Sequence, residues 1–161
     1  MTYQIQSLPR EPFTSLFSMS DEELFAVGAR RWVADAPGRA PCRISLVDAD
    51  AGDRLVLLHH QHMTDSRTPY RAGGPIFVRE VAEEARPEPG EVPPMLAKRP
   101  LSIRIYDARN MMIEGEVIEG ADLDARLTHW FGNRHTAQVH IHFAPRGCYL
   151  ARAVRAGTWP R

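Results

Sequence analysis

The stretch from Thr136 to Val154, TAQVHIHFAPRGCYLARAV, predicts a β-hairpin whose two faces differ in chemistry. Its first half alternates apolar and polar residues, which is the period of a half-buried strand. The break Ala144-Pro145-Arg146-Gly147 combines a proline with a glycine that tolerates positive φ, so we expect the turn there. The apolar set is Ala137, Val139, Ile141 and Phe143, and the polar set is Thr136, Gln138, His140 and His142.

A four-residue loop also predicts which residues of this hairpin lie opposite each other. It pairs Phe143 with Cys148 and His142 with Tyr149, and opposite residues share a face of the sheet. We therefore expect Cys148 to be buried with the apolar set. His140, His142 and Tyr149 should line the other face.

Length, charge and cysteine content narrow the classes of protein. The chain has 161 residues, with 20 basic and 20 acidic ones and a formal net charge of zero. At this size a single domain, residues 1–161, buries about 70% of its unfolded surface. The lack of a charge block predicts no nucleic-acid partner, and no apolar stretch reaches the ~18 residues of a membrane span. We expect a cytoplasmic protein in which Cys42 and Cys148 are free thiols.

The rest of the chain predicts more strands and two main helices. One helix starts after Ser20, which has the spacing of a capping box with Glu23, and runs to about Ala29. The other carries Leu123, Leu127, Trp130 and Phe131 on one side and ends at Gly132. The order of elements predicts an α+β fold with a largely antiparallel sheet of seven or eight strands. Outside the hairpin, strands are expected near residues 3–8, 30–35, 54–62, 76–81, 101–106 and 111–118.

Two H-x-H pairs, His60/His62 and His140/His142, form the main candidate site. Residues two apart on a strand point to the same face, so each pair brings two imidazoles within reach of one ion. If the two strands are neighbours, four nitrogen ligands converge on a divalent transition metal such as zinc. The alternative is that the imidazoles satisfy each other, Tyr149 and backbone carbonyls without a metal.

A thiol and two arginines are further candidates for catalysis, together with Tyr149. Cys42 lies beside Arg43, and a neighbouring guanidinium can lower a thiol pKa enough to make a nucleophile that pairs with a histidine. The alternative for Cys42 is a buried, inert thiol. Arg79 follows a strand that begins with glycine and proline, which favours a place at a pocket rim. Either Arg43 or Arg79 would neutralise an anionic substrate.

Several short motifs of the sequence resemble those of the bacterial domain-of-unknown-function family DUF1203. The resemblance extends from Tyr3 to Arg152 and implies no established activity, cofactor or catalytic residue. The motifs are Thr68-Pro69-Tyr70, GPIFVRE at 74–80, GEVPP at 90–94, and the closing VHIH and GCYLAR.

Two classes of function follow from these patterns. The first is a small enzyme or binding protein with a histidine-lined pocket that takes a small-molecule ligand. The second is a non-catalytic module without a metal, in which the same face binds a partner or a second copy to form a homodimer.

Overall fold

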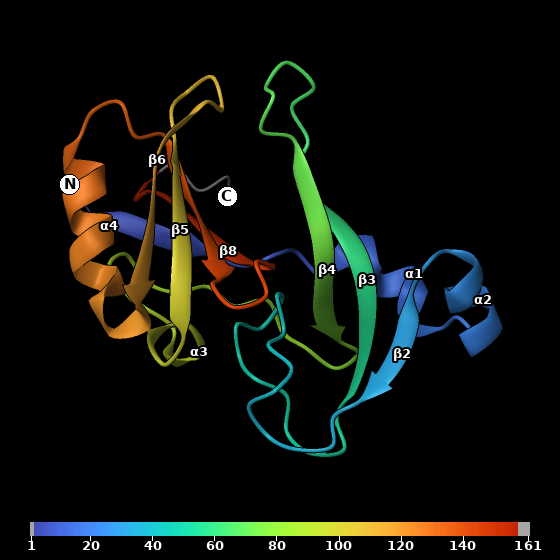
Figure 1. The fold of residues 1–161 in the computed structure, drawn as a ribbon. Coiled ribbons are helices and arrows are strands. Elements are labelled where there is room, and N and C mark those ends of the chain that lie inside the picture. The colour runs from blue at the N-terminus through green and yellow to red at the C-terminus, as the bar shows by residue number, and fades with distance from the viewer. Residues whose placement is uncertain (1, 158–161) are drawn as a thin grey trace.

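The computed structural model describes residues 2–157, which form two antiparallel sheets (Figure 1). This arrangement confirms the predicted α+β class. The larger sheet contains, in order, β1 (Tyr3–Gln6), β8 (Tyr149–Arg155), β7 (Gln138–Phe143), β5 (Pro100–Tyr106) and β6 (Met112–Glu119). The smaller sheet contains β2 (Arg30–Val33), β3 (Arg54–Met63) and β4 (Ala72–Arg79), with β3 in the centre.

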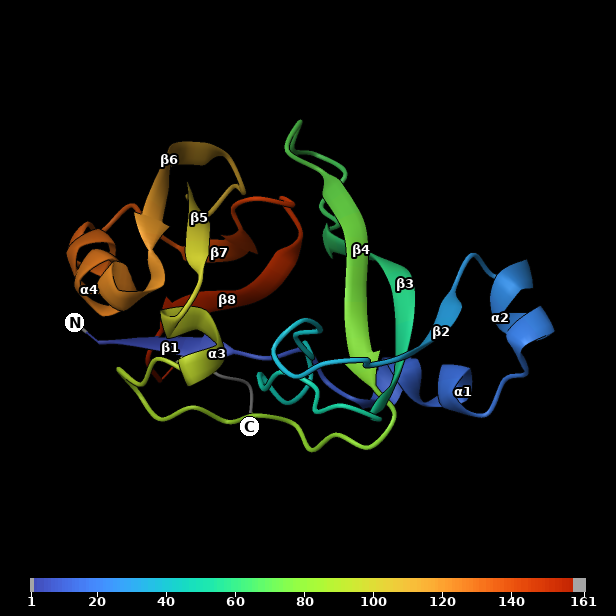
Figure 2. The ribbon, with the colours of Figure 1, turned by 60° about the horizontal axis from the view of Figure 1, so that its bottom comes forward.

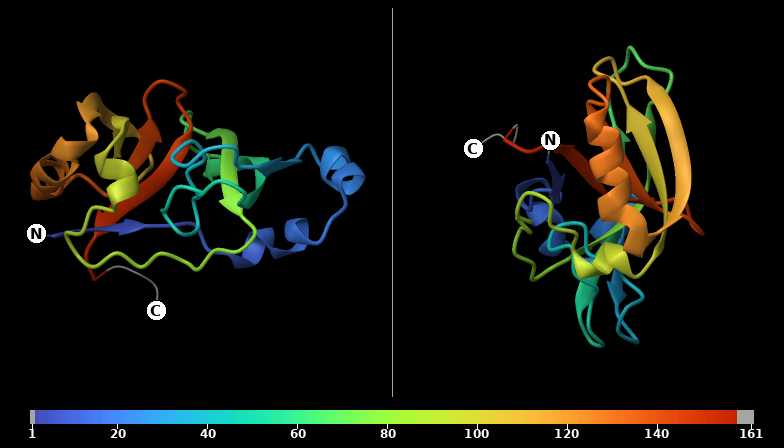
Figure 3. Two further views of the ribbon diagram at one scale, coloured as in Figure 1. Left: turned by 90° about the horizontal axis from the view of Figure 1, so that it is seen from below. Right: turned by 90° about the vertical axis from the view of Figure 1, so that its left-hand side faces the viewer.

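The main core lies between the larger sheet and helix α4 (Leu123–Gly132), which runs along the outer face of that sheet (Figure 3). Leu123, Leu127 and Phe131 recur every four residues on the helix, so their side chains form one apolar stripe. The stripe packs on Val139 and Ile141 of β7, both completely buried. Helix α4 and the histidine hairpin therefore share one hydrophobic core.

The other helices are short. Helix α2 (Asp21–Ala26) begins with the predicted capping box, in which Ser20 and Glu23 each accept a hydrogen bond from the backbone of the other. It ends three residues before the predicted Ala29, because Gly28 adopts φ 78°. The remaining pieces are η1 (Glu11–Phe13), α1 (Thr14–Phe17), α3 (Pro94–Ala97) and η2 (Gly120–Asp122).

A long connector from β4 to α3 ties the two sheets together, as Figures 2 and 3 show. Its prolines leave most of it without regular structure, yet it is anchored by hydrogen bonds. The Gly90 backbone N–H donates to Tyr3 O at 2.9 Å, and the Ala85 N–H donates to Ile44 O at 2.8 Å. These bonds satisfy connector groups that would otherwise be unpaired.

The β7–β8 hairpin has the predicted register beside its loop. His142 lies opposite Tyr149, and the Phe143 N–H donates to Cys148 O at 2.9 Å. One residue further on, the pairing shifts so that Ile141 faces Ala151, which leaves Leu150 as the extra residue of a β-bulge.

The predicted burial of Cys148 is wrong. Its thiol is free, as predicted, but Cys148 is partly exposed and Cys42 is the fully buried cysteine. The Phe143–Cys148 pair lies at the loop end of the hairpin, where Phe143 is also only half-buried at the edge of the core.

No helix within residues 2–157 is both long enough and apolar enough to cross a membrane.

A candidate metal centre between the sheets

Three histidines from the two sheets meet in the interior. Strand β7 contributes His140 and His142 on the face opposite Val139 and Ile141, and β3 contributes His62. One ligand nitrogen from each of the three lies within 4.8 Å of the others. The β3–β4 pairing passes from Gln61↔Gly73 to Met63↔Ala72, so His62 is the extra residue of a second β-bulge. A bulge re-aims the side chain that it carries, and here it accompanies the approach of His62 to the larger sheet.

The three imidazoles are neutral at physiological pH. His140 and His142 are 1% and 0% exposed. Burial, with a smaller contribution from the positive charge of Arg104, lowers the pKa of each of these two histidines to about 3 and that of His62 to about 4. Each ring therefore keeps one nitrogen lone pair, which is the form that binds a metal.

The tautomer of His142 follows from one hydrogen bond. Its Nδ1 lies 2.9 Å from the carbonyl oxygen of Gly147, and a carbonyl oxygen can only accept. Nδ1 therefore carries the proton and donates it. The lone pair is on Nε2, which is buried without a hydrogen-bond partner.

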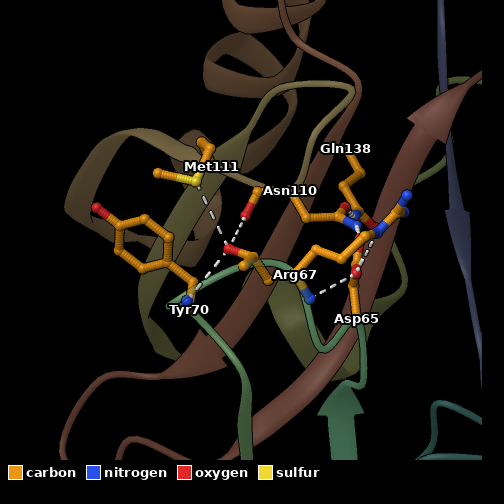
Figure 4. Close-up of polar contacts among 7 residues, drawn as sticks. Asp65, Arg67, Tyr70, Asn110, Met111 and Gln138 are labelled. Atoms are coloured by element: carbon orange, nitrogen blue, oxygen red, sulfur yellow. Dashed lines mark hydrogen bonds and ion pairs between the residues drawn. The ribbon is translucent and has the colours of Figure 1, made fainter.

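A chain of amides, part of it visible in Figure 4, orients His140 in the same way. It starts at Asp65, where the hydrogen bonds from Arg67 hold the carboxyl pKa well below its usual range. The ionised carboxylate only accepts, so Asn110 Nδ2 donates to it at 3.0 Å. Gln138 Nε2 then donates to Asn110 Oδ1 at 2.7 Å. Gln138 Oε1 is left facing His140 Nε2 at 3.2 Å, so this nitrogen is the donor.

The consequence for His140 is that its lone pair is on Nδ1, which is also buried without a partner. Asn110 itself is held by the Thr68-Pro69-Tyr70 segment, because the Thr68 hydroxyl donates to Asn110 O at 2.8 Å. Asp65, Asn110 and Gln138 were not predicted as site residues. The one local signal at these positions is the left-handed φ of 60° at Asn110, a conformation that asparagine favours in turns.

His62 and Tyr149 complete the cluster. Both ring nitrogens of His62 are buried without hydrogen-bond partners. The Tyr149 ring stacks on His62 with centroids 5.2 Å apart and meets His140 and His142 edge-on at 5.6 and 5.8 Å. Burial raises the pKa of Tyr149, so its phenol remains protonated.

His60 does not join the group of converging nitrogens, although the sequence suggested four ligands. Its ring contacts Phe13 and Tyr149, with centroids at 6.0 and 6.1 Å. The two H-x-H pairs lie on facing sheets and not on neighbouring strands. No ladder holds facing sheets in register, so of the β3 pair only His62 joins His140 and His142.

Comparison with known proteins supports the family resemblance. The model of a family described as "Protein of unknown function (DUF1203)" matches residues 39–155. The chain belongs to the DUF1203 family. The matched range contains all three converging histidines and Tyr149. Neither the curated proteins nor the solved structures gave a significant match.

The other candidates for catalysis in this DUF1203 protein separate into two pairs. Cys42 and Arg79 contact each other, since the Arg79 backbone N–H donates to Cys42 Sγ at 3.3 Å. The Arg79 guanidinium forms an ion pair with Asp53 at 3.0 Å. Arg43 instead adjoins the histidine cluster, because its Nε donates to Tyr149 O at 2.7 Å.

The histidine cluster of the DUF1203 protein borders a polar hollow of about 520 Å³. Its lining includes His62 and Gln138, together with Asp65, Arg67, Asn110 and Arg152. A small polar molecule could therefore approach His62 from this side.

Proposed function

We propose that His62, His140 and His142 bind a divalent transition metal such as zinc, and that the bound ion takes a small ligand from the adjacent hollow. One observation carries the proposal: three neutral imidazoles converge, two of them buried and His62 partly buried, and each has a buried ring nitrogen without a hydrogen-bond partner. Buried nitrogen atoms without partners are rare in folded proteins, because each one loses its hydrogen bonds to water. A metal ion would satisfy all three at once.

The surroundings of two of the histidines have the form found around metal ligands. A ligating imidazole normally donates its second N–H to a carbonyl or carboxylate, which fixes the tautomer. His142 donates to Gly147 O, and His140 donates to the Gln138 amide oxygen at the end of the chain from Asp65. The alternative in which the imidazoles satisfy each other leaves these lone pairs unexplained.

The number of ligands favours a functional site over a structural one. Structural zinc sites are closed by four protein ligands, whereas catalytic sites use three and leave a position open. Within the described range 2–157, no cysteine or carboxylate joins the three histidines. An ion held in this way polarises a bound carbonyl or phosphoryl group, or lowers the pKa of a bound water.

The charges around the site favour an anionic ligand. Arg104 on β5 and Arg152 on β8 lie opposite His140 on either side of β7. Together with a divalent ion, the exposed Arg152 and the partly buried Arg104 would create an excess of positive charge beside His140. A negatively charged ligand at the open position would offset it.

Titration calorimetry with zinc at pH 8, together with metal analysis of the purified protein, tests this proposal. We expect one zinc ion per chain. The double substitution His140→Gln and His142→Gln should weaken zinc binding at least a hundredfold, because the amides keep polar groups on the face without comparable metal affinity.

Two controls isolate the triad. Replacing the exposed His129 and His135 by Gln removes the same number of imidazoles and should leave zinc binding unchanged. His60→Gln should also preserve the stoichiometry, since His60 lies outside the converging group. The proposal fails if the wild-type protein purifies without metal and takes up no zinc, nickel or iron at pH 8.

A further inference from the structure

A second hollow, of about 570 Å³, lies at the loop end of the β7–β8 hairpin. Four of its lining residues are arginines and none is acidic: they are Arg39, Arg43, Arg99 and Arg146. Such a concentration of one sign of charge in a concave site attracts oppositely charged ligands. Of the four, only Arg99 has a carboxylate partner in the described part of the chain, since it pairs with Asp48.

Arg43 is the unusual member of this set. It is 1% exposed, and its guanidinium donates to two backbone carbonyls, Tyr149 O at 2.7 Å and Pro41 O at 2.5 Å, and also interacts with the Cys148 thiol. No ion pair to Arg43 exists within residues 2–157. Burial lowers the pKa of its guanidinium, which reflects the cost of holding a charge away from water. A buried charge is normally compensated by an opposite one. Within residues 2–157 the groups around the Arg43 guanidinium are backbone carbonyls and the thiols of Cys148 and Cys42, and no carboxylate pairs with it.

The rim and walls of the hollow narrow the chemistry of the missing partner. Arg39 and Arg146 are exposed at its edge, so their side chains can turn toward a ligand. The walls between the rim and Arg43 are largely apolar, with Leu57, Phe77 and Phe143 among them. Apolar walls around a few placed polar groups are typical of pockets for small organic molecules.

We propose that this pocket binds the carboxylate or phosphate group of a small organic anion, with Arg43 as the buried anchor and Arg39 and Arg146 closing on it from the rim. Guanidinium groups suit both kinds of oxoanion, because their N–H donors match two oxygens at once. The pocket is separate from the metal centre. Tyr149 lies between them, with its carbonyl bonded to Arg43 and its ring on the histidines.

Calorimetric titration with inorganic phosphate and, separately, with succinate tests the pocket and distinguishes the two oxoanions. Arg43 is a poor position for the test, since its replacement leaves two buried carbonyls unpaired. The double substitution Arg39→Gln and Arg146→Gln is confined to exposed side chains and should weaken binding of the preferred anion at least tenfold. The matched control is Arg109→Gln with Arg134→Gln, which removes the same charge from exposed positions elsewhere. It should change binding less than twofold.

The variant His140→Gln with His142→Gln distinguishes this pocket from the proposed metal centre. Anion binding should persist in that variant, because no histidine lines the pocket. Its loss there would mean that the anion binds at the histidines and would overturn the pocket. Equal weakening by the two arginine double variants, or no binding of either probe, would overturn it as well.

Cys148 supplies an independent measurement, because its partly exposed thiol lines the pocket while Cys42 is completely buried. A cationic pocket should concentrate the anionic reagent iodoacetate relative to the neutral iodoacetamide. We expect the ratio of the two alkylation rates at Cys148 to exceed that of free glutathione severalfold. It should fall toward the glutathione value in the Arg39→Gln, Arg146→Gln variant. A ratio equal to that of glutathione in the wild type would contradict the proposal.

Discussion

The two faces of strand β7 are equally buried, but one is apolar and the other carries polar side chains. Val139 and Ile141 face helix α4, and His140 and His142 face the smaller sheet, and all four are at most 1% exposed. On the outer face Val139 and Ile141 pack in a hydrophobic cluster with Leu123, Leu127 and Phe131 and carry no polar side-chain atoms. On the inner face two imidazole nitrogens have no hydrogen-bond partner. Burial alone therefore does not distinguish a core from a site, whereas unsatisfied polar atoms do.

The two faces of β7 should also contribute differently to the stability of the protein. The outer face should carry most of the folding energy, through the hydrophobic effect and close packing. The inner face costs stability unless a ligand satisfies it, since buried polar groups without partners are unfavourable. Proteins depart from well-satisfied interiors chiefly at functional sites.

The largest expected effect is on the outer face. Replacing Ile141 by Ala should lower the free energy of unfolding by about 2–5 kcal/mol, because the completely buried side chain would leave a cavity against α4. Urea denaturation of the metal-free protein would measure it. An unchanged denaturation midpoint would mean that the outer face is not the stabilising core, and the contrast between the faces would disappear.

The inner face should make the protein sensitive to acid. The folded pKa of His140 is about 3 and its ordinary value is 6.5, so below pH 6.5 the unfolded chain binds a proton that the folded chain does not. The stability contribution is complete above pH 6.5 and is lost as the pH falls from there toward 3, at about 1.4 kcal/mol per pH unit for one histidine.

His140→Gln should therefore remove about 2 kcal/mol of the stability difference between pH 7 and pH 5. Few carboxylates titrate in that interval, so the histidines dominate it. Denaturation of chelator-treated protein at both pH values would give the difference, with exposed His135→Gln as the control. If wild type and His140→Gln lose stability equally on acidification, His140 is not held neutral by the fold.

The elements of the outer face could be predicted from the sequence because their signals are local. The alternation of residues 137–143 gave the strand and its two faces, and the four-residue spacing of α4 gave the helix that covers one of them. Both patterns can be recognised within one short segment of the chain. The loop at 144–147 similarly determined that His142 lies opposite Tyr149.

The full set of residues on the inner face could not be predicted from the sequence, because tertiary contacts bring them together and no local pattern indicates those contacts. The bulges at His62 and Leu150 shift the register of their strand pairs, and no local pattern in the sequence marked either position. Asp65, Asn110 and Gln138 come from three separate segments of the chain. Their role appears only when tertiary structure brings those segments together. Cys148 obeyed the predicted pairing but lies beyond the edge of the core, so its face of the strand did not determine its burial.

The smallest effect, and the most specific test of the inner face, concerns Asn110. This residue touches no histidine, and it acts on His140 through Gln138 alone. Asn110→Gly removes the side chain while keeping the left-handed φ of 60°, which glycine adopts without strain, so the turn should be retained. Without Asn110 Oδ1 the Gln138 amide is free to rotate, and it no longer imposes one tautomer on His140.

Loss of such an outer partner weakens metal binding by about 10–100-fold, and the indirect action of Asn110 places the expected loss near tenfold. Zinc calorimetry on Asn110→Gly would measure it. Asn133→Gly is the control, because the exposed Asn133 side chain accepts a hydrogen bond from the His135 backbone and is not part of the amide chain. Urea denaturation should give Asn110→Gly a free energy of unfolding close to that of the wild type. A zinc affinity equal to that of the wild type would mean that the amide chain orients nothing, and that the inner face is polar without being tuned for a ligand.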